Sequence, residues 1–367
     1  MDKKFILEKK ELFWILTNII TIKMFFTYPR YMIINSGNAA WLQCIYVSLI
    51  SIIIYWITIN LYKKTGALSI LDAAEKTGGS FLKIIVGITI TLALLINMSI
   101  TVRTLPESIK TVLLPLTPMR YLILFLSIAT AIGAYYGLYA VARIHSLFMP
   151  IAALIFLAML LLLIPHTDIN NIFPIFGKGT YNILVTGLEG IGIYSDLLIL
   201  YIIMPFAGNF DDVKKSGMKA IITASVASVI IVFMYNVIYI YPASEDFIMP
   251  VYQITRLIKI GDFFQRLEAF FEFVWSISIM LYASLYLFVI CHIWKEIFDL
   301  KYYKELIFPF AVIFSALAFI PSSTAQMNNL VKVISVVTIP VCLFLPALIG
   351  AGCKIKARAK KNLPDGQ

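Results

Sequence analysis

Charged residues are scarce in this chain. Only 14% of its 367 residues are Asp, Glu, Lys or Arg, whereas 60% are hydrophobic and the mean hydropathy is +0.89. A water-soluble globule of this length needs more polar surface than such a composition supplies. The composition therefore excludes a soluble globular protein and predicts a polytopic membrane protein.

Cysteine and histidine are also few, and their spacing indicates no metal centre. No CxxC pair occurs, and no histidine has a ligand-like spacing to a cysteine; these residues are Cys44, Cys291, Cys342, Cys353, His145, His166 and His292. Cysteines in apolar runs behave as small hydrophobic residues. We therefore expect no disulfide framework, metal or other cofactor, and the lack of a nucleophile–base pair argues against an enzyme.

The net charge of +10 does not indicate a nucleic-acid partner, because the basic residues form short clusters between apolar runs. Such clusters are typical of membrane topology signals. With the N-terminus in the cytoplasm, the inner segments hold 20 of the 30 Lys and Arg residues and the outer segments 8. Both termini are therefore predicted to be cytoplasmic.

Ten apolar runs approach the length that crosses a hydrocarbon core of ~30 Å. They lie at about 12–34, 41–62, 81–102, 119–142, 144–165, 181–206, 217–241, 267–293, 305–321 and 330–351. We expect residues 1–353 to form one ten-helix, transporter-like transmembrane domain, and residues 354–367 a basic cytoplasmic tail. Two outer loops, 165–179 and 242–266, either form a cap together or are plain connections.

The first run carries Lys23 near its middle. A lysine at that depth costs roughly 2.5–3.5 kcal/mol on insertion scales, so it requires a reason. Its neighbours in the run include Thr17, Asn18, Thr21 and Thr27. These polar and β-branched side chains favour a locally distorted helix, and we expect Pro29 to end the regular turn. The first span is thus predicted to be a broken helix that lines a ligand cavity.

The sixth run is weakened by Gly187, Gly190 and Gly192. Each glycine costs roughly 1 kcal/mol relative to alanine in a helix, and backbone freed at membrane depth must line a cavity or be buried in protein. The first and sixth runs each begin a half of five, which is the layout of inverted-repeat transporters with discontinuous helices. Alternatively, the glycines only allow close helix packing.

Several ionisable and polar residues are candidates for a site at these two spans. Lys23 is a fixed cation that pairs with Asp196 or Glu189, a proton-coupled group, a partner for a ligand carboxylate, or part of a purely structural ion pair. The predicted ligand-binding residues are Thr21, Ile22, Lys23, Met24, Phe25, Ser99, Gly190, Ile191, Gly192, Ser195, Trp275 and Ser276. The predicted charge network comprises Lys23, Arg103, Glu189, Asp196, Glu268 and Glu272.

Several short motifs, in order along nearly the whole chain, resemble a known family. They are FFTYPR (25–30), Arg103 followed by Thr117-Pro118, GLYAVAR (137–143) with Pro150, DINNIFPIFGKG (168–179), Asp196 with Pro205, and RLEAFFEFVW (266–275). The chain resembles the B subunits of nutrient germinant receptors of endospore-forming bacteria (GerAB/GerKB type), spore germination proteins within the amino acid–polyamine–organocation transporter superfamily.

This resemblance implies an all-α fold of about ten transmembrane helices, a LeuT-like 5+5 inverted repeat with helices 1 and 6 broken, in the spore inner membrane. It also implies a small nutrient ligand, often an amino acid, and two partners, a receptor A subunit and a lipoprotein C subunit. Two departures stand out. The first span has Lys23 instead of a glycine-rich unwound segment, and Asp196 stands where relatives commonly carry glutamate.

Two functions stay open on the sequence. The first is a germinant receptor subunit that binds a nutrient in a midplane cavity and triggers germination. The second is an autonomous, proton-coupled transporter of amino acids or organic cations. The resemblance does not separate them, because the receptor uses the transporter's scaffold.

Overall fold

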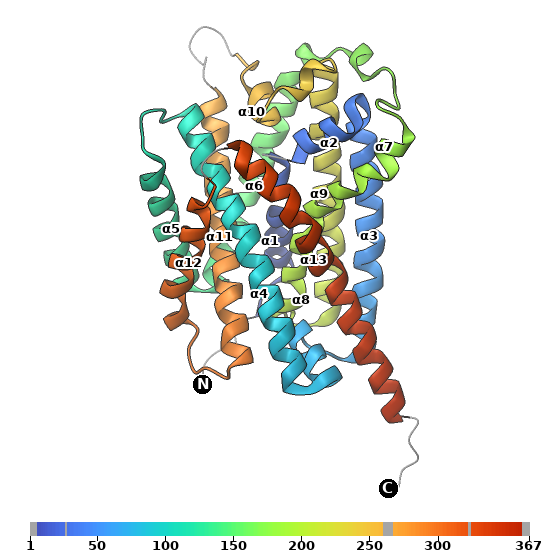
Figure 1. Cartoon of the computed structure of the whole chain (residues 1–367), viewed down its shortest axis with the longest axis vertical. Helices are drawn as coiled ribbons and strands as arrows, with labels where there is room; N and C mark the ends of the chain where they lie inside the picture. The colour runs from blue at the N-terminus through green and yellow to red at the C-terminus, as the bar shows by residue number, and fades with distance from the viewer. Residues whose placement is uncertain (1–5, 26–27, 260–266, 322–323, 362–367) are drawn as a thin grey trace.

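The computed structural model describes residues 6–25, 28–259, 267–321 and 324–361, and most of them are helical. Long helices run between the two ends of a bundle (Figure 1). Large apolar side chains are exposed along their outer faces, as at Leu49, Ile53 and Trp56 on α3 (Ala40–Thr65). Such a surface suits contact with lipid, because hydrocarbon does not penalise apolar side chains. The predicted all-α membrane fold is confirmed.

The first span is broken near its charge, as predicted. It consists of α1 (Lys9–Thr21), the 3-10 turn η1 (Ile22–Phe25) and α2 (Tyr28–Ser36). The hydroxyls of Thr17 and Thr21 bond back to carbonyls four residues earlier, which competes with regular winding. The expectation for Pro29 was wrong. It does not end a helix but lies in the first turn of α2, where a missing N–H costs nothing.

The remaining runs of the first half form four helices. They are α3, α4 (Ile70–Val112), α5 (Met119–Tyr136) and α6 (Leu138–Leu163). Gly79, with φ of 73°, interrupts α4 just before the third predicted run begins. The boundary between the fourth and fifth runs was misplaced at Arg143. The chain turns at Gly137, whose φ of 85° few other residues adopt, and Arg143 lies inside α6.

The sixth span departs from α-helical winding over most of its length. After α7 (Thr180–Leu184) the chain forms a 3-10 segment, η5 (Thr186–Ile199), before α8 (Leu200–Ile203) and η6 (Met204–Phe206). A 3-10 run of this length is uncommon and is typical of strained or functional segments. Gln43 packs against Gly187 and donates to its carbonyl at 2.9 Å. The predicted weak span is therefore a tightly wound one, with its backbone buried in protein.

The second half contains α9 (Phe210–Ile238), α10 (Pro250–Thr255), α11 (Leu267–Ile297), α12 (Ile307–Phe319) and α13 (Thr324–Lys361). Within the described residues, eight helices are long and apolar enough to cross a membrane. The broken first span and the 13-residue α12 fall below that length, although both match predicted runs. The last helix continues beyond Cys353 to Lys361.

The two ends of the bundle consist of different elements. At one end, Lys9 of α1 pairs with Asp212 at 2.9 Å, and Lys63 of α3 pairs with Asp211 at 2.8 Å. The C-terminal part of α13 reaches the same end, shown at the bottom of Figure 1, whereas α2, α7 and α10 gather at the top. Which of the two ends faces the cytoplasm stays a prediction.

The two predicted outer loops meet at that upper end. Lys178, from the loop before α7, pairs with Glu245, from the loop before α10, at 2.5 Å. The same ammonium donates to the carbonyl of Ile34 in α2, also at 2.5 Å. In the described part of the two loops, the cap interpretation therefore has contacts that support it, although 260–266 lie outside the described residues.

Candidate functional site

The break in the first span meets the 3-10 segment of the sixth at a buried ion pair. Lys23 of η1 lies 2.8 Å from Asp196 of η5, with side chains 9% and 1% exposed. Its ammonium also donates to Ser195 Oγ at 2.7 Å and to the carbonyl of Gly192 at 3.3 Å. A lysine has three N–H donors, so these acceptors use its full capacity. Of the two carboxylates proposed as its partner, Lys23 uses Asp196.

The winding of η5 explains this arrangement. Side chains three residues apart eclipse each other in a 3-10 helix. Ser195 lies one such turn after Gly192, and its hydroxyl donates to the carbonyl of Gly192 at 2.8 Å, so the two oxygens lie side by side and Asp196 follows directly. Gly192 also packs against the hydroxyl of Tyr28 in α2, where an added Cβ would collide with that oxygen. A side chain at Gly192 would push the two broken spans apart.

Aromatic residues of α11 close the other side of the pair. Tyr286 donates its hydroxyl to Oδ1 of Asp196, and the ring of Tyr282 lies 4.2 Å from that of Tyr286 between centroids. Oδ2 of Asp196 has no hydrogen-bond partner among the described residues. The pair thus links three spans in the buried interior of the bundle. Removing one member of such a pair leaves an uncompensated buried charge, at a cost of about 3–5 kcal/mol.

The predicted ligand-binding residues do not all meet in one place. Thr21, Met24 and Trp275 line an apolar hollow between α1, α6 and α9, with about 900 Å³ of space including its open mouth. Ile22 is fully buried in the hydrophobic core. The side chain of Phe25 lies outside the part of the chain that the structure describes.

The remaining predicted ligand-binding residues make contacts with their own surroundings in the bundle. Gly190 packs against Gln43, and Ile191 lies in the core. Ser99 and Ser276 donate their hydroxyls to carbonyls of their own helices, at 2.6 and 2.8 Å. This use of serine hydroxyls is common within helices.

The predicted charge network separates into independent groups. Arg103 bonds to Glu107 at 3.1 Å and to the carbonyl of Ala318 at 3.4 Å. Glu189 is exposed, away from the buried Lys23–Asp196 pair, and the expectation that it joins that pair is not met. Glu268 and Glu272 line a separate cavity.

Sequence reasoning missed three residues that shape these groups, and a helical spacing could have found them. Glu107 follows Arg103 by four residues, the spacing at which opposite charges meet on a helix. Tyr282 and Tyr286 are also four apart, on the face of α11 that covers Asp196.

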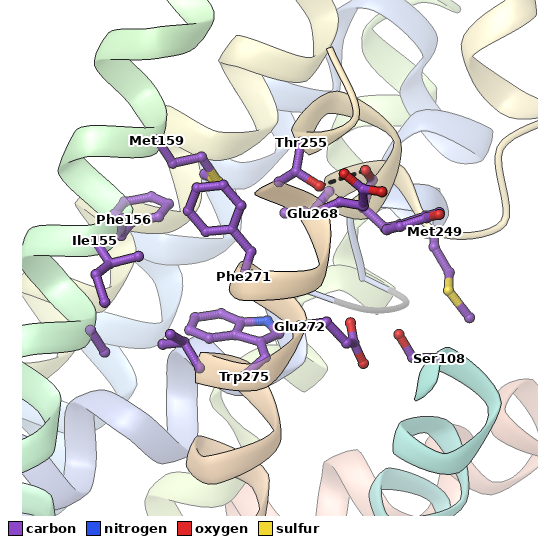
Figure 2. Close-up of a pocket in the computed structure, with 14 residues that line it drawn as sticks. Ser108, Ile155, Phe156, Met159, Met249, Thr255, Glu268, Phe271, Glu272 and Trp275 are labelled. Carbon is purple, nitrogen blue, oxygen red and sulfur yellow. Dashed lines mark hydrogen bonds between the residues drawn. The ribbon is translucent and has the colours of Figure 1, made fainter. Parts of the chain in front are cut away.

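The separate cavity lies between α4, α6, α10 and α11, with about 540 Å³ of space when the open solvent at its mouth is counted (Figure 2). Glu268, Phe271, Glu272 and Trp275 enter it from α11, and Ser108 from α4. Figure 2 shows Glu272 and Ser108 directed toward each other. We call this the outer cavity. It shares Ala152, Phe156 and Trp275 with the apolar hollow, so these three side chains separate the two spaces.

Among the described residues, no group of three or more His, Cys, Asp and Glu side chains is placed to hold a metal ion.

Comparison with solved structures shows the fold. The nucleobase-cation-symport-1 family transporter Mhp1, in a closed conformation with bromovinylhydantoin bound, superimposes with a TM-score of 0.63. The match covers 94% of this chain and 80% of that one at 12% identity. MhsT in complex with L-phenylalanine gives 0.58, over 97% and 92% of the two chains at 14% identity. These likenesses show a LeuT-type transporter fold.

Comparison of sequences shows the family. Spore germination protein B2 of Bacillus subtilis (strain 168) is 22% identical over 254 residues, which is 68% of each chain. The profile of the family described as "Spore germination protein" matches residues 6–327. A match over most of the length, on a transporter-type fold whose broken spans meet at Lys23 and Asp196, agrees with the motifs noted in the sequence. The chain belongs to the spore germination protein family.

Proposed function

We propose that this chain is the ligand-binding membrane subunit of a spore nutrient germinant receptor. It binds a small nutrient, an amino acid in our interpretation, beside its broken helices, and this binding triggers germination. The observation that supports the proposal is that the apolar hollow lies beside the Lys23–Asp196 ion pair, which we call the joint. Thr21 and Met24 line the hollow, and Lys23 between them holds the sixth span.

The Lys23–Asp196 ion pair is suited to couple ligand binding to a change in conformation. Lys23 is the contact through which η1 holds the oxygens of η5, so a shift of η1 strains all three of its bonds. A ligand that fits better when η1 has moved shifts the equilibrium toward that state. The shift is limited by the difference between its affinities for the two states. The nutrient enters from the outer end, where the outer cavity opens.

The subunit acts with partners in this proposal. The relative from Bacillus subtilis is a spore germination protein named B2. By analogy, this chain assembles with a receptor A subunit and a lipoprotein C subunit in the spore inner membrane, with both termini in the cytoplasm. Co-purification of the three from spore membranes is the direct check on the assembly.

A germination assay tests the role of the joint. Spores carrying Lys23→Ala or Asp196→Ala are exposed to the nutrient, and the fall in optical density of the suspension is followed. We expect both variants to lose the response, while immunoblots of spore membranes show that the protein accumulates. Lys64→Ala, at an exposed lysine of α3, is the matched control and responds normally. Normal responses in both joint variants contradict the proposed mechanism.

A second function is favoured by the structural neighbours, one of which is described as a transporter. In this alternative the chain carries amino acids or organic cations across the membrane by itself, and Lys23 couples transport to protons. Purified protein in liposomes distinguishes the two. Uptake of labelled amino acid that depends on a proton gradient favours the transporter. Binding without uptake, together with loss of germination in the variants, favours the receptor.

A further inference from the structure

The outer cavity is acidic as well as apolar. Glu268 and Glu272 enter it from successive turns of α11, and both are more than nine-tenths buried. None of the described residues that line it is a lysine or an arginine. Like charges four residues apart on a helix repel each other, and burial in a low-dielectric environment strengthens that repulsion. Glu268 has an interaction partner of its own, so Glu272 is the carboxylate that favours a positive charge inside the cavity.

Glu272 supplies the second and independent observation. It is 6% exposed, and its Oε1 atom has no hydrogen-bond partner among the described residues. Ser108 is the polar side chain directed toward its carboxylate in Figure 2. A buried carboxylate oxygen without a donor is costly, and proteins normally provide one. The position that a donor to this oxygen would occupy lies in the space of the cavity.

Two cations of the bundle, Lys23 and Arg103, are engaged elsewhere. The three bonds of Lys23 go to η5, and Arg103 is held by Glu107 and the carbonyl of Ala318. Neither is among the residues that line the outer cavity. Among the described residues, no lysine or arginine lines the cavity beside Glu272.

The side chains that line the outer cavity indicate what kind of cation it accepts. Phe156, Phe271 and Trp275 present aromatic rings to the cavity, and Figure 2 shows Phe271 and Trp275 one above the other on α11, on the side facing Phe156. Aromatic faces attract cations and also pack against apolar groups. An inorganic ion would leave most of this surface unfilled.

We propose that the outer cavity binds a small organic ammonium ion with an apolar body, and that Glu272 is its counter-ion. The ammonium group donates to the free carboxylate oxygen, and the body lies against Phe156, Phe271 and Trp275. Amines and the amino groups of apolar amino acids share this chemistry. The inference rests on the proposed function only in that the chain receives a ligand from the outer end.

A binding experiment on purified full-length protein tests the proposal. The chain is placed in phosphatidylcholine nanodiscs and titrated with phenethylammonium, its neutral analogue 2-phenylethanol, and the anion 3-phenylpropionate. We expect binding of the cation and little or none of the other two. Because a hydrogen bond to a charged group is lost, Glu272→Gln should weaken cation binding by roughly ten- to a hundredfold. Glu305→Gln, at an exposed glutamate after α11, is the control and keeps wild-type affinity.

Further measurements keep the outcome decisive. Glu272→Asp retains the charge and should retain the preference for the cation. If Glu272→Gln does not fold, the wild-type comparison still decides, because equal affinity for phenethylammonium and 2-phenylethanol overturns the proposal. Undiminished cation binding in a folded Glu272→Gln protein also overturns it. Titration with L-phenylalanine then separates the two sources, since Glu272-dependent binding identifies amino acids and its absence identifies simple amines.

This result is separable from the germination assay. Spores that respond through the Lys23–Asp196 joint, combined with a purified protein that does not prefer cations, overturn only the ammonium site. Selective cation binding combined with normal germination of the joint variants overturns only the proposed receptor mechanism.

Discussion

Two buried carboxylates in this bundle are treated in opposite ways. Asp196 receives donors from Lys23 and Tyr286, contributed by two other spans. Glu272 is buried to a similar degree, and each carboxylate leaves one oxygen, Oδ2 of Asp196 and Oε1 of Glu272, without a hydrogen-bond partner among the described residues. The difference is that no described lysine or arginine lines the cavity that Glu272 enters. The first arrangement uses its charge to join the protein to itself. In our proposal the second arrangement keeps its charge for a bound cation, and the contrast is between a structural ion pair and a binding surface.

The largest expected effect comes from breaking the joint. Lys23→Met leaves Asp196 charged and buried, which should lower the free energy of unfolding by about 3–5 kcal/mol. The measurement is thermal unfolding of purified protein in detergent. Lys23→Met combined with Asp196→Asn removes both charges and should recover much of the loss. A double variant less stable than either single one would show that the pair is not a coupled unit.

A smaller effect is expected from the aromatic side of the joint. Tyr286→Phe removes the hydroxyl that donates to Asp196, and a hydrogen bond to a charged group contributes about 1.5–3 kcal/mol. Tyr55→Phe is the matched control. Tyr55 is equally buried, but its hydroxyl donates to the carbonyl of Lys214 at 3.1 Å, so its loss should cost about 0.5–1.5 kcal/mol. Equal melting temperatures for the two variants would contradict the special role of Asp196.

The outer cavity should respond with the opposite sign. Glu272→Gln replaces a buried charge, in a cavity that no described lysine or arginine lines, by a neutral amide, so we expect the unliganded protein to gain about 1–3 kcal/mol of stability. The same thermal assay measures the gain, in the absence of added amine. A loss of stability comparable to that of Lys23→Met would show that Glu272 has a structural partner, and the contrast between the two carboxylates would fail.

The exposed ion pair of the outer loops should show the smallest effect. Lys178 and Glu245 are each 28% exposed, and pairs of this kind contribute about 0–1 kcal/mol. A double-mutant cycle with Lys178→Ala and Glu245→Ala measures the coupling, which should fall as salt is added. A coupling as large as that of Lys23 and Asp196 would mean that depth in the bundle does not set the strength of these pairs.

The break in the first span was predictable because it depends on local sequence. Lys23 and the threonines around it are neighbours in the chain, and their effect on winding needs no tertiary information. The partner of Lys23 was not predictable to a single residue. It lies more than 170 residues away, and either acid of the sixth run was a candidate.

The misplacement of Glu189 has a geometric cause. Glu189 and Asp196 are seven residues apart, a spacing that puts them on one face of an α-helix. The span is instead wound as a 3-10 helix, with three residues per turn, so the two side chains point about 120° apart. Composition predicts that glycines weaken a helix but not which winding replaces it.

The outer cavity was accessible to sequence only in part. The spacing of Glu268 and Glu272 predicts that they share a face of α11, and the structure confirms it by placing both in one cavity. That the face opens onto Ser108 and Phe156 depends on how α4 and α6 pack against it, which the spacing does not contain.

The two contacts of the Lys178 ammonium have a mechanical consequence. One ammonium holds the last turn of α2, through the carbonyl of Ile34, and the loop of the other half, through Glu245. Since α2 continues the span that contains Lys23, a tilt of that half-helix pulls on both loops at once. A movement that starts near Lys23 would thus change the positions of the two loops at the end of the bundle where α2, α7 and α10 lie.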